Sequence, residues 1–108
     1  MTDDDIPKRA IELKLLHVQA LIMGGQIKRM RDLKDSSSTK IAKYAGINQG
    51  RYASKLYTPG EFTATEISRI SYILDIKPTI IMEIIANEIY EEEAARVTEN
   101  ISKANTKR

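Results

Sequence analysis

Apolar residues recur every three or four positions along most of this 108-residue chain. Such spacing places apolar side chains on one face of an α-helix, and no stretch shows the alternation of a half-buried strand. Helix-breaking residues interrupt the pattern at Gly24-Gly25, 36–38, Gly46 and 58–60. We therefore expect an all-α fold of about six helices, in a chain too short for a second large domain.

A helix with a long apolar stripe is expected near each end of the chain. From Pro7 to Met23 two stripes overlap, which predicts a helix buried on more than one side. Pro78 suits the first turn of a helix that continues through Ile101. These stripes exceed what one small domain needs, so we expect at least one of them to join two copies of the chain. The stripes expected to join two copies are Ile11, Leu15, Val18 and Ile22 at one end and Tyr90, Ala94, Val97 and Ile101 at the other; the second stripe of the first helix is Leu13, Leu16, Ala20 and Met23.

Two short helices are expected in the middle of the chain. The first runs from Thr39 to Ala45, capped by a serine of 36–38. It stops at Gly46, which suits the left-handed conformation that ends helices. Asn48 then caps a second helix over roughly 49–57. Two short helices separated by a three- or four-residue turn are the pattern of a helix-turn-helix.

Two further helices are expected on either side of this pair. The earlier one follows Gly24-Gly25 and carries Ile27, Met30 and Leu33. The later one starts at about Ala64, where Thr63 and Glu66 have the spacing of a capping box.

Charge is distributed unevenly along the sequence, although the net charge is only +2. Between residues 26 and 57 there are eight basic residues against two acidic ones, and between 83 and 99 six glutamates against one arginine. Such asymmetry is expected when one face of a protein meets phosphates and another does not, although a merely well-solvated surface gives the same pattern.

Several classes of function have no support in the sequence. The chain has no cysteine, so it forms neither disulfides nor a thiolate zinc site, and the single His17 cannot hold a metal alone. Adjacent carboxylates at 91–93 point in different directions on a helix. The acidic start differs from a signal peptide, and no apolar run reaches membrane-spanning length. We expect a cytoplasmic non-enzyme without cofactor, metal, membrane contact or small-molecule substrate.

A set of positions in and around the two short helices resembles the XRE family, the lambda-repressor and Cro-like DNA-binding domains. That family has apolar and Arg positions in helix one, Leu-Ala in helix two, Gly-Val at the turn, and apolar residues around helix four. The matching residues here are Ile27, Met30, Arg31, Ile41, Ala42, Gly46, Ile47, Ile67, Ile70, Leu74 and Ile76.

The resemblance implies a lambda-repressor-like five-helix domain with an extra N-terminal helix and an extended C-terminal helix. Residues 1–24 would be an acidic leader and N-terminal helix, 25–90 the helix-turn-helix domain, and 91–108 a helical extension with a basic tail. Within these ranges, 1–7 and 103–108 are expected to hold no fixed structure.

In similar domains the second helix of the motif enters the major groove and the first lies on the phosphate backbone. This implies a transcriptional regulator, most simply a repressor, that reads double-stranded DNA with residues 48–56 and binds as a homodimer. The implied base contacts are Gln49, Arg51, Ser54 and Lys55. The implied phosphate contacts are Ser37, Ser38, Lys40, Lys43, Asn48 and Tyr57.

The rotation of this recognition helix has two possible solutions. With no gap against the family pattern, Tyr52 faces the core and Lys55 takes a normally apolar place. With one extra residue at the turn, Ala53 and Leu56 face inward and Lys55 faces the groove; we favour this second register. The family's glutamate partner of Arg31 is absent, and Glu61 is a candidate for that role.

A different class of function also fits the sequence. Gly50 and Ala53 lie on the recognition helix and offer no polar group to a base. A helix-turn-helix fold that has exchanged DNA for a protein partner, as an antitoxin or regulatory subunit, would tolerate such residues.

Overall fold

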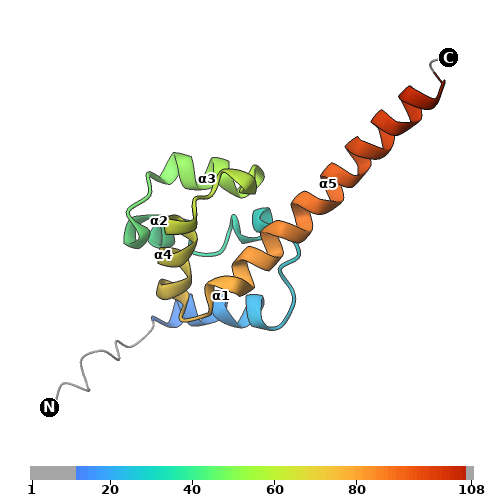
Figure 1. Ribbon diagram of the computed structural model, residues 1–108. Coiled ribbons are helices and arrows are strands. Elements are labelled where there is room, and N and C mark those ends of the chain that lie inside the picture. Colours follow the sequence, from blue (N-terminus) through green and yellow to red (C-terminus); the bar gives the residue numbers. More distant parts are fainter. Residues whose placement is uncertain (1–11, 107–108) are drawn as a thin grey trace, which may run out of the picture.

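The computed structural model describes residues 12–106, and every regular element within this range is helical (Figure 1). The all-α prediction is confirmed for the described residues. The five α-helices are α1 (Leu13–Met23), α2 (Ser38–Ala45), α3 (Gln49–Tyr57), α4 (Ala64–Leu74) and α5 (Pro78–Thr106). Two short 3-10 turns accompany them, η2 (Met30–Leu33) and η3 (Pro59–Glu61).

A single hydrophobic core holds α1 to α4 and the first part of α5 together. α4 lies at the centre of this body, in contact with α1, α2 and α5, while α3 packs on α2 and η2. Tyr52 is fully buried and meets Phe62 edge to face, with 6.1 Å between the ring centroids. Burial also raises the pKa of the Tyr52 hydroxyl.

α1 contributes only one of its two apolar stripes to the core. Leu15, Val18 and Ile22 are buried, whereas Ile11 lies outside the described residues. The second stripe, Leu13, Leu16, Ala20 and Met23, is exposed. The prediction of a helix buried on more than one side is therefore wrong, because α1 lies on the outside of the body and has core on one side only.

The expected helix around Ile27, Met30 and Leu33 is replaced by the single 3-10 turn η2. Arg29 is extended, and the Asp32 carboxylate accepts from the backbone N–H groups of Lys28 and Arg29. The Met30 N–H donates to the buried Glu88 carboxylate of α5 at 3.2 Å. These carboxylates satisfy amides in a conformation that is not α-helical, while the apolar residues are still buried.

Local signals around α2 and α3 were mostly predicted correctly. Gly46 ends α2 in the left-handed conformation (φ 71°), and the Asn48 side chain accepts from the Arg51 N–H at the start of α3. The serine cap is wrong, because Ser37 precedes α2 with φ 58° and makes no capping bond with its side chain. The Ser38 hydroxyl instead donates backward, to the carbonyls of Leu33 and Lys34.

The second half of the fold begins as its sequence predicts. Thr63 and Glu66 form the expected capping box at the start of α4, and Pro78 begins α5. α5 continues to Thr106, so the expected fraying from Lys103 is wrong as far as the described residues extend. Its residues 90–106 are all exposed, and this part of the helix extends away from the body (Figure 1). No helix in the described part of the chain is both long and apolar enough to cross a membrane.

Candidate nucleic-acid interface

The rotation of α3 combines features of both registers considered above. Tyr52 and Leu56 lie one turn apart, and both are fully buried. The first register placed only Tyr52 of this pair in the core, and the second placed only Leu56 there. Ala53 is exposed, so its expected inward position is wrong. The large Tyr52 ring fills the space toward Phe62, and this sets which side of α3 faces the core.

Lys55 is held by a neighbouring helix. Its ammonium group donates to both carboxylate oxygens of Glu66 on α4, at 2.8 and 2.9 Å, and both side chains are largely buried. The bond from Lys55 and the backbone N–H of Thr63 together lower the pKa of the Glu66 carboxyl. Lys55 therefore joins α3 to α4, and the expected orientation of this side chain toward a groove is wrong.

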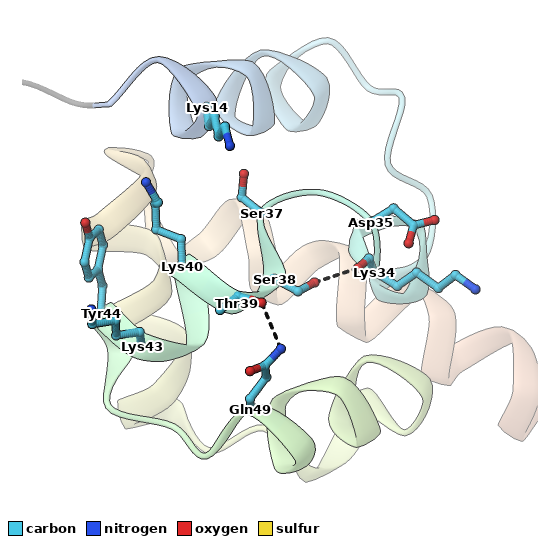
Figure 2. Close-up of a pocket in the computed structure, with 10 residues that line it drawn as sticks. All are labelled: Lys14, Lys34, Asp35, Ser37, Ser38, Thr39, Lys40, Lys43, Tyr44 and Gln49. Carbon is cyan, nitrogen blue, oxygen red and sulfur yellow. Dashed lines mark hydrogen bonds between the residues drawn. The ribbon is translucent and has the colours of Figure 1, made fainter.

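The exposed side of α3 carries Gln49, Arg51 and Ser54. The Gln49 amide nitrogen donates to the Thr39 hydroxyl at 2.8 Å, so the first turn of α3 is fastened to the first turn of α2 (Figure 2). Asn48, also exposed, uses its side-chain oxygen as the cap of α3. Gln49, Arg51 and Ser54 form the surface expected to meet bases, and Asn48 beside them is one of the expected phosphate contacts.

Beside this surface lies an open hollow of about 790 Å³ at the start of α2, here called the cationic hollow. Four lysines border it, against the single carboxylate of Asp35 among the residues that line it. Figure 2 shows Lys14 reaching over from α1 toward Ser37 and Lys40. The lining residues are Lys14, Lys34, Asp35, Ser37, Ser38, Thr39, Lys40, Lys43, Tyr44 and Gln49.

An acidic residue just before α1 already binds two groups of the hollow. The Glu12 carboxylate accepts from the Lys40 ammonium and, at 2.6 Å, from the Tyr44 hydroxyl. The bond from Lys40, followed by that from Tyr44, lowers the pKa of Glu12, and the same carboxylate raises the pKa values of Lys40 and Tyr44. Lys40 is thus partly neutralised in the isolated chain, whereas Lys14 and Lys43 form no ion pair with another described residue.

The structure brings together Ser37, Ser38, Lys40 and Lys43 of the six expected phosphate contacts. Tyr57 lies at the other end of α3, where the Arg31 guanidinium sits 5.2 Å from the centre of its ring. The partner of Arg31 is Glu88, 3.7 Å away on α5, and the suggestion of Glu61 is wrong. Glu88 was missed because it lies 57 positions after Arg31 in the sequence, and only the path of α5 brings the two together.

Sequence reasoning also missed Lys14, Lys34 and Thr39 as residues of the hollow. Lys14 lies on the half-exposed helix α1, which nothing in the sequence places beside α2. Thr39 follows Ser38 in the first turn of α2, and its contact with Gln49 depends on how α2 and α3 cross. Only the tertiary arrangement distinguishes these residues from other surface positions.

The chain matches no family model, and neither a curated protein nor a solved structure is detectably similar to it. The described residues contain no group of three or more His, Cys, Asp or Glu that could hold a metal ion.

Proposed function

We propose that this chain is a sequence-specific regulator of transcription, most simply a repressor, that binds double-stranded DNA as a homodimer. In this proposal the fold is of the lambda-repressor and Cro type, and α2 and α3 form its helix-turn-helix. α3, with its cap at Asn48, enters the major groove, and the start of α2 rests on the phosphate backbone.

One observation carries the proposal: the exposed side of α3 and the cationic hollow are neighbours, joined by the bond between Gln49 and Thr39. A reader of DNA needs base-contacting and phosphate-contacting side chains on the same surface, because phosphate contacts fix the register in which bases are read. Glu91–Glu93 lie on the projecting part of α5, away from this surface (Figure 1).

The side chains have suitable chemistry for the two roles. Arg51 can pair with O6 and N7 of guanine, and Gln49 can pair with N6 and N7 of adenine once its bond to Thr39 is exchanged. Ser54 adds a hydroxyl further along the same helix. Lys14, Lys40 and Lys43 supply the charge that phosphates require, and Ser37 adds a hydroxyl at the edge of the hollow.

The test compares two variants on a selected operator and on scrambled DNA over a series of salt concentrations. Arg51→Ala should lose about 1 to 3 kcal/mol on the operator and little on scrambled DNA, because it removes a base contact. Lys43→Ala should weaken binding to both DNAs alike and lower the salt slope by about one unit. Lys28→Ala, an exposed lysine that does not line the hollow, is the matched control and should change neither.

Two results would contradict the proposal. If the wild-type chain shows no binding that depends on salt, it is not a DNA-binding protein. If Arg51→Ala weakens both DNAs equally while Lys43→Ala loses discrimination between them, the roles assigned to α2 and α3 are reversed.

The second candidate is a protein-interaction module of the antitoxin or regulatory-subunit kind. Gly50 and Ala53 are both exposed on the side of α3 that would enter the groove, and neither offers a hydrogen-bonding side chain. Small residues let another backbone approach closely. Absence of DNA binding, together with a partner that is displaced by Ala53→Arg, would favour this second function.

A further inference from the structure

Among the described residues, the last turns of α5 form a helix without a tertiary partner. Every residue from Tyr90 to Thr106, here called the distal arm, is exposed, and the arm extends away from the body (Figure 1). An isolated helix of about 15 residues is only marginally stable in water, and most helices in proteins depend on the packing of an apolar face. A covering partner would supply the packing that this arm lacks.

The distal arm carries an apolar stripe at the spacing of a coiled coil. Tyr90, Ala94, Val97 and Ile101 follow one another at intervals of four, three and four residues. The large members of this stripe are well exposed: 74% for Tyr90, 50% for Val97 and 56% for Ile101. This alternation of intervals keeps one seam facing a partner helix along the whole arm.

We infer that the distal arm is a dimerisation element that pairs in antiparallel orientation with the distal arm of a second copy. Intervals of four, three and four read the same in both directions. An antiparallel pair can therefore set Tyr90 against Ile101 of the second copy and Ala94 against Val97 of the second copy. The two-fold axis repeats both contacts, giving four apolar layers in a closed, self-complementary interface. Each layer combines residues of different size.

Charge along the arm selects the antiparallel orientation. Its beginning holds the three adjacent carboxylates of Glu91–Glu93, whereas Lys103 lies near its end in an ion pair with Glu99, and Lys107 and Arg108 follow in the sequence. Parallel arms would place the acidic beginnings of both arms, with three carboxylates each, at the same end of the pair, and like charges repel. In an antiparallel pair the acidic end of one arm lies beside the basic end of the other, and the helix dipoles also oppose each other.

The first experiment measures mass by sedimentation equilibrium, with helix content followed by circular dichroism. The wild-type chain should sediment as a dimer, and Ile101→Glu should sediment as a monomer of unchanged helical fold in the body. Ser102→Glu adds the same charge one residue away on the outer side of the seam and should remain a dimer. A wild-type monomer at every protein concentration, or a dimer that Ile101→Glu does not affect, would overturn the inference.

The second experiment determines orientation, and the absence of cysteine from the chain makes it direct. Tyr90→Cys and Ile101→Cys are made in chains of different tag length, mixed and oxidised. Antiparallel arms should give the disulfide between the two variants, whereas parallel arms would give each variant joined to itself. Leu16→Cys samples the exposed stripe of α1 as an alternative partner. Disulfides of the parallel type, or between Ile101→Cys and Leu16→Cys, would show that the antiparallel pair is wrong.

This inference does not depend on DNA binding, because both measurements are made on the protein alone. The dimer can exist if the proposed function fails, and DNA binding can exist in a chain whose distal arm remains unpaired.

Discussion

Glu66 is the residue whose charge links two helices of the candidate site. Its carboxylate binds Lys55 of α3 and caps α4 through Thr63, and these bonds lower its pKa from the ordinary value of 4.5. A carboxyl with a lowered folded pKa stabilises the fold above its unfolded pKa, and this contribution is lost as the pH falls through the folded value.

We therefore predict that Glu66→Gln is less stable than the wild type at pH 7 and that the difference narrows below about pH 4, since a glutamine retains the capping bond but not the charge. Urea unfolding at pH 7 and pH 3 measures both free energies. Glu61→Gln, an exposed position in η3, is the matched control and should change little at either pH. Equal differences at the two pH values would show that the charge of Glu66 contributes nothing.

Glu12 competes with phosphate for Lys40 if the proposed function is correct. Removing its charge frees the Lys40 ammonium and takes a repelling carboxylate away from the hollow. Glu12→Gln should therefore bind all DNA sequences more tightly and raise the salt slope by up to about one unit. An electrophoretic shift series measures this, with Glu99→Gln on the distal arm as control. Weaker binding by Glu12→Gln would mean that Glu12 positions Lys40 for DNA.

Residue-scale prediction succeeded where the chemistry is local. The Asn48 cap and the capping box of Thr63 and Glu66 involve residues three positions apart, so their spacing alone indicates them. Lys55 was misplaced because its partner is eleven residues away, and its position depends on the packing of α3 against α4.

At the scale of elements, Gly46 controls the angle between α2 and α3. Its φ of 71° lies in the left-handed region, and a Cβ there would meet only the end of Arg69, 3.9 Å away. Space is therefore not limiting, and the cost of a side chain comes from the backbone alone. We predict that Gly46→Ala loses about 1 to 2 kcal/mol of stability. Thermal unfolding should show a drop of roughly 4 to 8 °C per kcal/mol.

Gly46→Asn is the informative companion to that variant. Asparagine adopts the left-handed conformation more readily than alanine, so this variant should unfold at a temperature between those of the wild type and Gly46→Ala. If the two variants unfold together well below the wild type, a steric clash rather than backbone strain would be the cause.

Element type was predictable only where an apolar period and end signals agreed. α4 and α5 have both, and they form as expected. The segment containing Met30 and Leu33 has apolar spacing but lies beside carboxylates that bind its amides, and it forms only η2. The apolar period also predicted burial for both stripes of α1. Burial depends on which other elements pack against each side of the helix, and the period carries no information about those elements.

At the scale of the whole molecule, the structure separates a packed body from an unpacked distal arm. Charge asymmetry in the sequence correctly placed basic residues around the helix pair and acidic residues on the last helix. The charge pattern did not indicate that Lys14 and Glu12 lie beside α2, because that contact depends on how α1 packs against the rest of the body. Removing α1 to test dimerisation would be uninformative, since Leu15, Val18 and Ile22 belong to the core.

Truncation after Tyr90 leaves the core intact, unlike removal of α1, and it tests whether the body and the distal arm act together in DNA binding. All buried residues of α5 precede the cut, namely Ile81, Ile85 and Glu88, so the unfolding temperature measured in dilute solution should stay close to that of the wild type. If two bodies bind DNA through paired arms, the truncated monomer makes half as many phosphate contacts, and the slope of log affinity against log salt should fall to about half. Ser102→Glu should keep the full slope because it lies outside the seam. An unchanged slope in the truncated chain would mean that each body binds DNA independently of the arm, whatever the arm does in the free protein.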